Sequence, residues 1–115
     1  MKRQDAVELY IVLKDLRSGS MTKEGLTEYI MMRLKLKKVY DDFEQARIEI
    51  SEQTKNEDKD IWNKTFIPVM NKWLSEEIET IKTGILDQSD FVELVIKNDL
   101  TGIIEDNLYN KLVKI

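Results

Sequence analysis

Cysteine and histidine are both missing from this chain of 115 residues. Without cysteine it can form no disulfide and no thiolate metal site, as expected in a reducing compartment. Without histidine it lacks the commonest general base and metal ligand near neutral pH. Glycine-rich phosphate loops and nucleophile elbows are missing too. We therefore expect a protein that is not an enzyme and that needs no cofactor and no metal.

Turn residues and long hydrophobic runs are also scarce. Proline occurs once and glycine four times, which is fewer turn-forming residues than a strand-rich fold needs. No stretch approaches about 18 consecutive apolar residues, so we expect no membrane-spanning helix. The first residues, Met1–Asp5, lack the apolar run of a signal peptide. These absences predict a helical, cytoplasmic protein that does not insert into a membrane.

Charge is abundant but slightly acidic, with 35% charged residues and a net charge of −4. Residues 1–55 carry 11 basic and 10 acidic side chains, whereas residues 56–115 carry 7 basic and 12 acidic ones. An acidic domain gains little from releasing the counterions of a phosphate backbone, so we expect no nucleic-acid binding. The length is typical of one domain, and we predict a single helical domain over residues 1–115.

One long amphipathic helix dominates the pattern, from Thr22 to Gln53 with Thr22 as its N-cap. Apolar residues recur along it at alternating steps of three and four, as in a heptad seam. Three more apolar residues, Leu26, Ile30 and Leu34, predict that its N-terminal half is buried on more than one side. The seam consists of Tyr29, Met32, Leu36, Val39, Phe43, Ala46 and Ile50.

The length of this helix carries a consequence for packing. A helix of about 32 residues spans about 48 Å, whereas a domain of this size has a radius of gyration of about 13 Å. Something must therefore cover the seam, either a second helix of the same chain or another chain, for example in a homodimer. We predict that the seam residues and Trp62 form the interaction surface. Trp62 lies in a polar stretch and could either cap the core or contact a partner.

Shorter helices flank the long one. An apolar stripe predicts a first helix over Asp5–Arg17, ended by Gly19. The polar stretch Ser51–Lys64 is expected to be a turn. A helix then follows, with Trp73 in the core.

Two features of that third helix leave alternatives. A start at Thr65 places Pro68 in the first turn, where a missing N–H is harmless, and is preferred. A start near Asp60 would instead place Pro68 inside the helix. Beyond Ser75 the stripe favours continuation to Lys82, but an extended segment over Glu77–Leu86 is the alternative.

The C-terminal third predicts two short helices. Ser89 is expected to cap the first, Asp90–Asn98, and the second is Ile103–Val113. Their inward residues are expected to be Phe91, Leu94 and Val95 in the first helix and Ile104, Leu108 and Leu112 in the second. The apolar tail, including Val113 and Ile115, should dock onto the core. The predicted fold is thus mostly all-α, a long-helix hairpin with one short N-terminal and two short C-terminal helices.

Two charged clusters could carry chemistry, and we favour a structural interpretation of each. The acidic residues lack a glycine-anchored Asp-x-Asp loop, so a solvated surface is expected instead of a cation site. The basic residues flank the seam and are expected to lay their stems along it while keeping their charges in water. The acidic cluster is Glu76, Glu77, Glu79, Asp87 and Asp90, and the basic one is Arg33, Lys35, Lys37 and Lys38.

The order of elements resembles that of small phage and prophage helical proteins of uncharacterised function. The resemblance lies in a short helix, a long heptad-like helix, a polar turn, a helix of the type NKTFIPVMNKWLSEE, and the ending LDQSDFVELVIKNDLTGIIEDNLYNKLV. It covers most of the chain and rests on architecture and spacing. It implies an accessory or structural component of a phage particle or of its assembly, and it carries no catalytic residues.

Two functions follow from these patterns. The first is a non-enzymatic protein–protein interaction or assembly protein that self-associates or binds a protein partner through the long helix. The alternative is a small acidic regulatory or inhibitor protein that binds a basic protein partner through residues 76–106.

Overall fold

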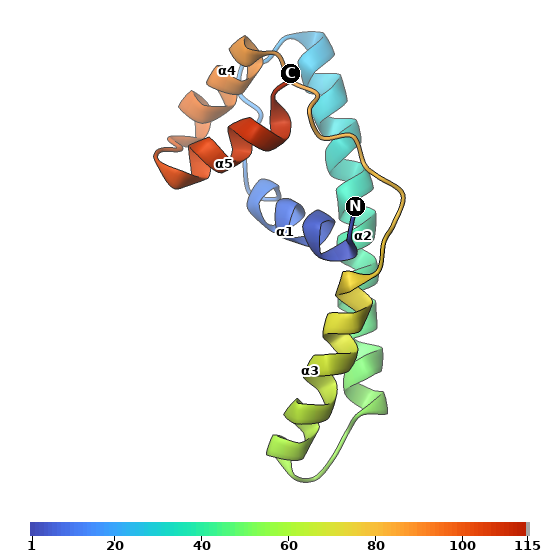
Figure 1. The fold of residues 1–115 in the computed structure, drawn as a ribbon. Helices are drawn as coiled ribbons and strands as arrows, with labels where there is room; N and C mark the ends of the chain where they lie inside the picture. Colours follow the sequence, from blue (N-terminus) through green and yellow to red (C-terminus); the bar gives the residue numbers. More distant parts are fainter. Residues whose placement is uncertain (115) are drawn as a thin grey trace. The chain divides into compact units, whose positions relative to one another are not determined.

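The structure is a computed structural model that describes residues 1–114. That part of the chain contains five helices and no strand, and about 70% of the chain is helical. The all-α prediction, with one long helix and short flanking helices, is confirmed (Figure 1). The helices are α1 (Arg3–Leu13), α2 (Lys23–Gln53), α3 (Lys59–Ser75), α4 (Gln88–Asn98) and α5 (Ile103–Leu112).

The chain divides into two compact units, and α1 and α2 contribute residues to both. Unit 1 contains Met1–Tyr10 and Leu36–Thr80. Unit 2 contains Ile11–Lys35 and, within the described residues, 81–114. Each unit has its own buried side chains and its own polar contacts, so the two are described in turn.

Unit 1 is built on a hairpin formed by the C-terminal half of α2 and by α3 (Figure 1). Its centre is a cluster of Ala46, Ile50 and Met70, against which four partly buried side chains pack, Phe43, Phe66, Trp73 and Leu74. A row of ring contacts extends this cluster, with centroids 5.0 Å apart for Tyr10–Tyr40, 5.9 Å for Tyr40–Phe43 and 6.3 Å for Phe43–Trp73. The predicted core position of Trp73 agrees with this packing.

Helix α3 begins at Lys59, so the preferred start at Thr65 is wrong and the earlier alternative is correct. Asp58 is the N-cap, and its carboxylate accepts hydrogen bonds from the backbone N–H groups of Asp60 and Ile61. An aspartate cap of this kind satisfies donors that the first turn leaves free. Pro68 consequently lies inside the helix. The capping energy at Asp58 and the packing of the hairpin outweigh the local preference of proline.

Helix α3 ends at Ser75, so the favoured continuation to Lys82 is wrong and the extended alternative is correct. The backbone there pairs with the N-terminus instead of continuing the helix. The Arg3 N–H donates to the Glu76 carbonyl at 3.1 Å, the Ile78 N–H donates to the Met1 carbonyl at 2.8 Å, and Lys2 and Glu77 form an isolated bridge. These long-range bonds were invisible in a local helical pattern.

Unit 2 holds α4 and α5 against the beginning of α2. A short parallel bridge joins Leu86 to Val113, and the Leu86 N–H and Ile85 N–H both donate to the Leu112 carbonyl at 2.8 and 2.9 Å. The buried residues of this unit include Leu13, Tyr29, Met32, Leu86, Leu94, Leu108 and Leu112. The predicted docking of the tail holds for Leu108, Leu112 and Val113, whereas Ile115 lies outside the described residues.

Several predicted boundaries in unit 2 need correction. The first helix ends at Leu13 instead of Arg17, because the Arg17 backbone pairs with Asn98: its N–H donates to Asn98 Oδ1 at 2.7 Å, and Asn98 Nδ2 donates to its carbonyl at 2.6 Å. Gly19 does have a positive φ of 70°, but within a loop. Helix α4 starts at Gln88 with Asp87, not Ser89, at the cap position. Ile104 is exposed instead of facing inward.

Candidate functional site

The predicted interaction seam on α2 is covered within this chain. Five of its seven residues are buried, namely Tyr29, Met32, Leu36, Ala46 and Ile50, and the other two, Val39 and Phe43, are half-buried. In unit 1 the residues that cover it come from α3, through Met70 and its neighbours. A partner could reach these side chains only by displacing parts of the same chain, so the seam is not an accessible surface.

A second face of α2 is open to solvent in its N-terminal half. Ile30, Met31 and Leu34 are 46%, 51% and 61% exposed, and we call these three residues the α2 face. Residues three and four apart lie next to one another on a helix, so Ile30, Met31 and Leu34 form one continuous apolar patch. The sequence predicted that this half of the helix is buried on more than one side. The residues that the structure describes cover only the first side, because Ile30 and Leu34 remain exposed among them.

Charged side chains lie on either side of the α2 face. Glu24 and Glu28 precede it and Lys35 follows it along the helix. All three are exposed, and none forms an ion pair within residues 1–114. With the exposed Lys23 included, the net charge is negative at one end of the patch and positive at the other. Two such helices that pack antiparallel would bring opposite charges together.

Trp62 lies in the first turn of α3 and is half-buried, with its indole Nε1 donating to the Ser51 carbonyl at 3.1 Å. It also lines a cavity of about 400 Å³ between the end of α2 and the beginning of α3. Trp62 therefore fixes the two helices of the hairpin together and also forms part of the wall of this cavity. We call this cavity the hairpin groove, and its lining residues are Arg47, Ser51, Lys59, Trp62, Asn63 and Phe66.

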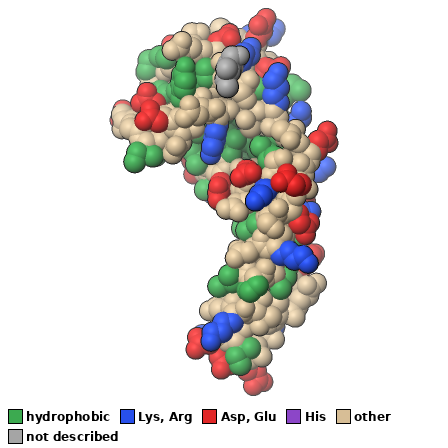
Figure 2. All heavy atoms as spheres, viewed as in Figure 1, with side chains coloured by type: hydrophobic (Ala, Val, Ile, Leu, Met, Phe, Trp, Pro, Cys, Tyr) green, Lys and Arg blue, Asp and Glu red, His purple; other side chains and the backbone are tan. Residues whose placement is uncertain are grey.

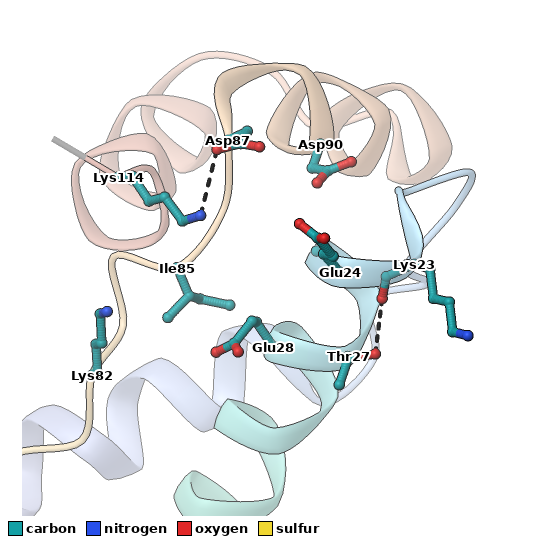
Figure 3. A pocket seen from close by; sticks show the side chains of 10 residues that line it. Lys23, Glu24, Thr27, Glu28, Lys82, Ile85, Asp87, Asp90 and Lys114 are labelled. Atoms are coloured by element: carbon teal, nitrogen blue, oxygen red, sulfur yellow. Dashed lines mark hydrogen bonds and ion pairs between the residues drawn. The ribbon is translucent and has the colours of Figure 1, made fainter.

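A cavity of about 420 Å³ lies in unit 2 at the beginning of α2, lined mostly by charged side chains (Figure 3). The carboxylates of Glu24 and Asp90 face its interior, whereas the Lys23 side chain points away from it. Lys114 reaches Asp87 at 3.5 Å across one edge. The lining mixes both signs of charge, and its most buried charged member has a structural role.

That member is Asp90, which is only 3% exposed. Its two carboxylate oxygens accept hydrogen bonds from the Thr22 N–H and the Thr22 hydroxyl, each at 2.8 Å. The Thr22 hydroxyl oxygen accepts in turn from the Gly25 N–H at 3.1 Å, which confirms Thr22 as the N-cap of α2. The prediction that Asp90 belongs to a solvated acidic surface is therefore wrong. The carboxylate instead fastens α4 to the start of α2.

The other acidic residues of that cluster remain at the surface, and most have partners. Glu76 forms an ion pair with Arg3 at 2.7 Å, and Glu77 one with the N-terminal ammonium group at 3.0 Å. The guanidinium of Arg3 also lies 4.3 Å from the centroid of the Trp73 ring. These contacts help to hold the extended segment after α3 against the N-terminus.

The basic cluster of the long helix is likewise engaged locally. Lys37 forms an ion pair with Asp41 one turn later at 2.9 Å, and this hydrogen bond raises the pKa of the Lys37 ammonium group. Arg33 donates to the Leu16 carbonyl at 3.4 Å, and its guanidinium lies 5.7 Å from the centre of the Tyr29 ring. Arg33 and Lys37 thus each interact with residues of their own unit.

Tyr29 is fully buried, and its hydroxyl has no hydrogen-bond partner among the described residues. Burial raises the pKa of the Tyr29 hydroxyl, and the nearby Arg33 guanidinium, which does not meet the geometry of a hydrogen bond to the hydroxyl, offsets only part of that rise. A buried hydroxyl without a partner destabilises the fold. This seam position is therefore one where the side chain of phenylalanine would fit the surroundings better.

Residues 1–114 contain no group of three or more acidic side chains placed to hold a metal ion. No helix there is both long enough and apolar enough to cross a membrane. Comparison with protein-family models, curated proteins and solved structures gave no match.

Proposed function

We propose that this chain is a non-enzymatic interaction protein that binds protein partners through its long helix α2. Its place in the cell is the cytoplasm, and its role is that of an accessory or assembly protein of the phage kind that its element order resembles. The observation that carries the proposal is the α2 face. Ile30, Met31 and Leu34 form an apolar patch that residues 1–114 leave exposed.

Exposed single apolar residues are common on proteins, but a contiguous patch rimmed by charges is typical of an interaction site. On the α2 face two of the three side chains are more than half exposed, and they lie beside each other on a rigid helix. A helix that presents apolar anchors at these spacings can pack against another helix. The buried seam on the opposite side holds α2 in place.

A second copy of the chain is the partner that the charges favour. In an antiparallel pair of α2 helices related by a two-fold axis, Glu24 and Glu28 of each copy approach Lys35 of the other. Such an interface is isologous, so every contact occurs twice. Opposite charges at its rim set the register and speed association more than they add affinity.

Cross-linking can test this pairing, because the chain has no cysteine of its own. In Met31→Cys, the two introduced thiols lie near the two-fold axis and should form a disulfide-linked dimer under mild oxidation. Ile48→Cys is the matched control, because Ile48 is 52% exposed on the same helix but lies outside the α2 face. Equal yields from the two variants would contradict the pairing.

Light scattering on the unmodified chain gives a second test. The wild-type protein should show a concentration-dependent rise in mass, and Leu34→Glu should lower it by placing a charge in the centre of the patch. Ile48→Glu should leave the mass unchanged. A wild-type protein that stays monomeric at tens of micromolar would exclude a second copy as the partner.

The alternative, an acidic regulator of a basic protein, has less support. Four acidic residues of the 76–106 segment already have partners in this chain: Glu76, Glu77, Asp87 and Asp90. A basic target would have to compete with these contacts. Binding of such a target would weaken steeply with salt, so an interaction indifferent to ionic strength would count against this function.

A further inference from the structure

The hairpin groove of unit 1 is built to receive an apolar side chain. The rings of Trp62 and Phe66 contribute to its walls, and both are half-buried. The bond from Trp62 Nε1 to the Ser51 carbonyl fixes the indole in place. Its volume of about 400 Å³ exceeds that of a single aliphatic side chain. The groove therefore already exists in the folded chain and does not need a rearrangement to open.

The polar part of the groove favours a negatively charged ligand. Its lining contains two basic side chains, Arg47 and Lys59, and no acidic one. Arg47 forms an ion pair with Glu44 at 2.9 Å, whereas Lys59 forms no ion pair within residues 1–114. Asn63 supplies a further donor from the same helix. The groove thus fits a peptide that carries an aliphatic residue next to a carboxylate.

The chain itself displays such a peptide in unit 2, at the beginning of α5. Ile103 is 79% exposed, the highest value among the large apolar residues within 1–114, and Ile104 is 51% exposed. Glu105 and Asp106 follow directly in the first turn of the helix. We call Ile103–Asp106 the α5 corner. Figure 2 shows hydrophobic side chains at the surface on this part of the molecule, around α4 and α5.

We propose that the hairpin groove of one copy binds the α5 corner of a second copy. Ile103 enters between the two aromatic rings, and Asp106 meets Lys59. This contact joins two different surfaces, so it is heterologous and can extend from copy to copy. It uses neither Ile30 nor Leu34, so it is independent of the α2 pairing proposed above. The buried area is small, so we expect weak, concentration-dependent association.

Site-directed cross-linking tests the contact between chains. Lys59→Cys and Asp106→Cys are made as separate proteins and mixed, so that any mixed disulfide must join two copies. The mixed product should exceed that of Lys59→Cys with Gln88→Cys, in which the second thiol is exposed elsewhere in unit 2. Equal yields from the two mixtures would overturn the proposal.

A charge exchange tests the recognition itself. Lys59→Glu alone and Asp106→Lys alone should each abolish the concentration-dependent rise in mass due to this contact. An equimolar mixture of the two variants should restore that rise, because the reversed charge pair and the original one can both form between unlike copies. Lys64→Glu, which makes the same charge change at an exposed residue outside the groove, should have no effect. Failure of the mixture to recover would show that the groove takes another ligand.

The measurements are made in the Leu34→Glu background as well as in the wild type. In the Leu34→Glu background the Met31→Cys cross-link should be lost and the Lys59–Asp106 pair retained. In the background without Leu34→Glu, absence of the Met31→Cys cross-link with retention of the Lys59–Asp106 pair would contradict only the α2 pairing. The reverse result would contradict only the groove contact.

Discussion

At the scale of single residues, the contact between Asp90 and Gly25 gives the clearest example of a constraint hidden from the sequence. Gly25 lies in the first turn of α2, where alanine would normally be the better residue. A Cβ at this position would overlap the Asp90 carboxylate, at Oδ2 and Cγ. The glycine is therefore required by a residue 65 positions away, and not by its own backbone angles.

We predict that Gly25→Ala destabilises the protein by about 1–3 kcal/mol, the usual effect of inserting a methyl group where no space exists. Thermal denaturation followed by circular dichroism would measure it. Gly84→Ala is the matched control, since its new Cβ would lie 3.4 Å from the Val113 carbonyl, an ordinary contact. A Gly25→Ala protein that melts higher than the wild type would show that the Asp90 carboxylate can move aside.

Tyr29 provides a prediction of opposite sign. Its hydroxyl is buried and lacks a partner among residues 1–114, so Tyr29→Phe should leave the stability at pH 7 unchanged or raise it by up to about 1 kcal/mol. Urea denaturation gives this difference. Tyr109→Phe, at a partly exposed tyrosine, is the control for the loss of a hydroxyl alone.

The pH dependence of stability in the wild type and in Tyr29→Phe tests whether burial of the Tyr29 hydroxyl is the cause. Burial raises the pKa of Tyr29 above its ordinary value of 10.0, so the folded state favours the neutral phenol. Its contribution to stability is complete below about pH 10 and is lost as the pH rises through the folded pKa. The wild type should lose more stability than Tyr29→Phe between pH 8 and about pH 11. Parallel losses in the two proteins would mean that Tyr29 is not protected from ionisation.

At the scale of elements, helix α3 shows why a proline did not mark the beginning of a helix. Pro68 is exposed and lies ten residues into α3, where it removes the hydrogen bond that its N–H would donate to the Lys64 carbonyl. Two features outweigh it. Asp58 caps the first turn, and Trp62 fastens that turn to the end of α2. Neither is visible from the apolar stripe alone.

We predict that Pro68→Ala stabilises the protein by about 1–2 kcal/mol. The gain is part of the roughly 3 kcal/mol that proline costs inside a helix, reduced by the greater freedom of alanine in the unfolded chain. Chemical denaturation measures the change, and Asp58→Ala should move it the other way by about 1 kcal/mol through loss of the cap. A destabilised Pro68→Ala protein would show that α3 needs a bend at this position.

At the scale of the whole molecule, the C-terminal segment is a part of the fold of unit 2 and not an appendage. Leu108, Leu112 and Val113 are buried, and the backbone between Leu112 and Lys114 exchanges three hydrogen bonds with Ile85 and Leu86. Removal of residues 107–115 would therefore expose apolar surface and leave buried backbone groups without partners.

We predict that this deletion lowers the melting temperature by at least about 5 °C, since it removes contacts worth more than about 1 kcal/mol. Differential scanning calorimetry would measure it. The single exposed substitution Lys114→Ala, which removes only the ion pair with Asp87, should have a small effect. A deletion variant with an unchanged melting temperature would show that the tail contributes nothing.

The sequence by itself determined the helical class, the extent of α2, the Thr22 cap and the apolar seam, because caps and helical periodicity act over one or two turns. It named Trp62 and the seam residues as candidates for interaction, and it did not single out the α2 face. Tertiary structure decided the rest. The ends of α1 and α3, the extended segment after Ser75 and the burial of Asp90 all depend on bonds between residues far apart in the chain. Burial in turn decided which side of α2 remains open, because the heptad seam is filled by the chain's own side chains and the α2 face is not.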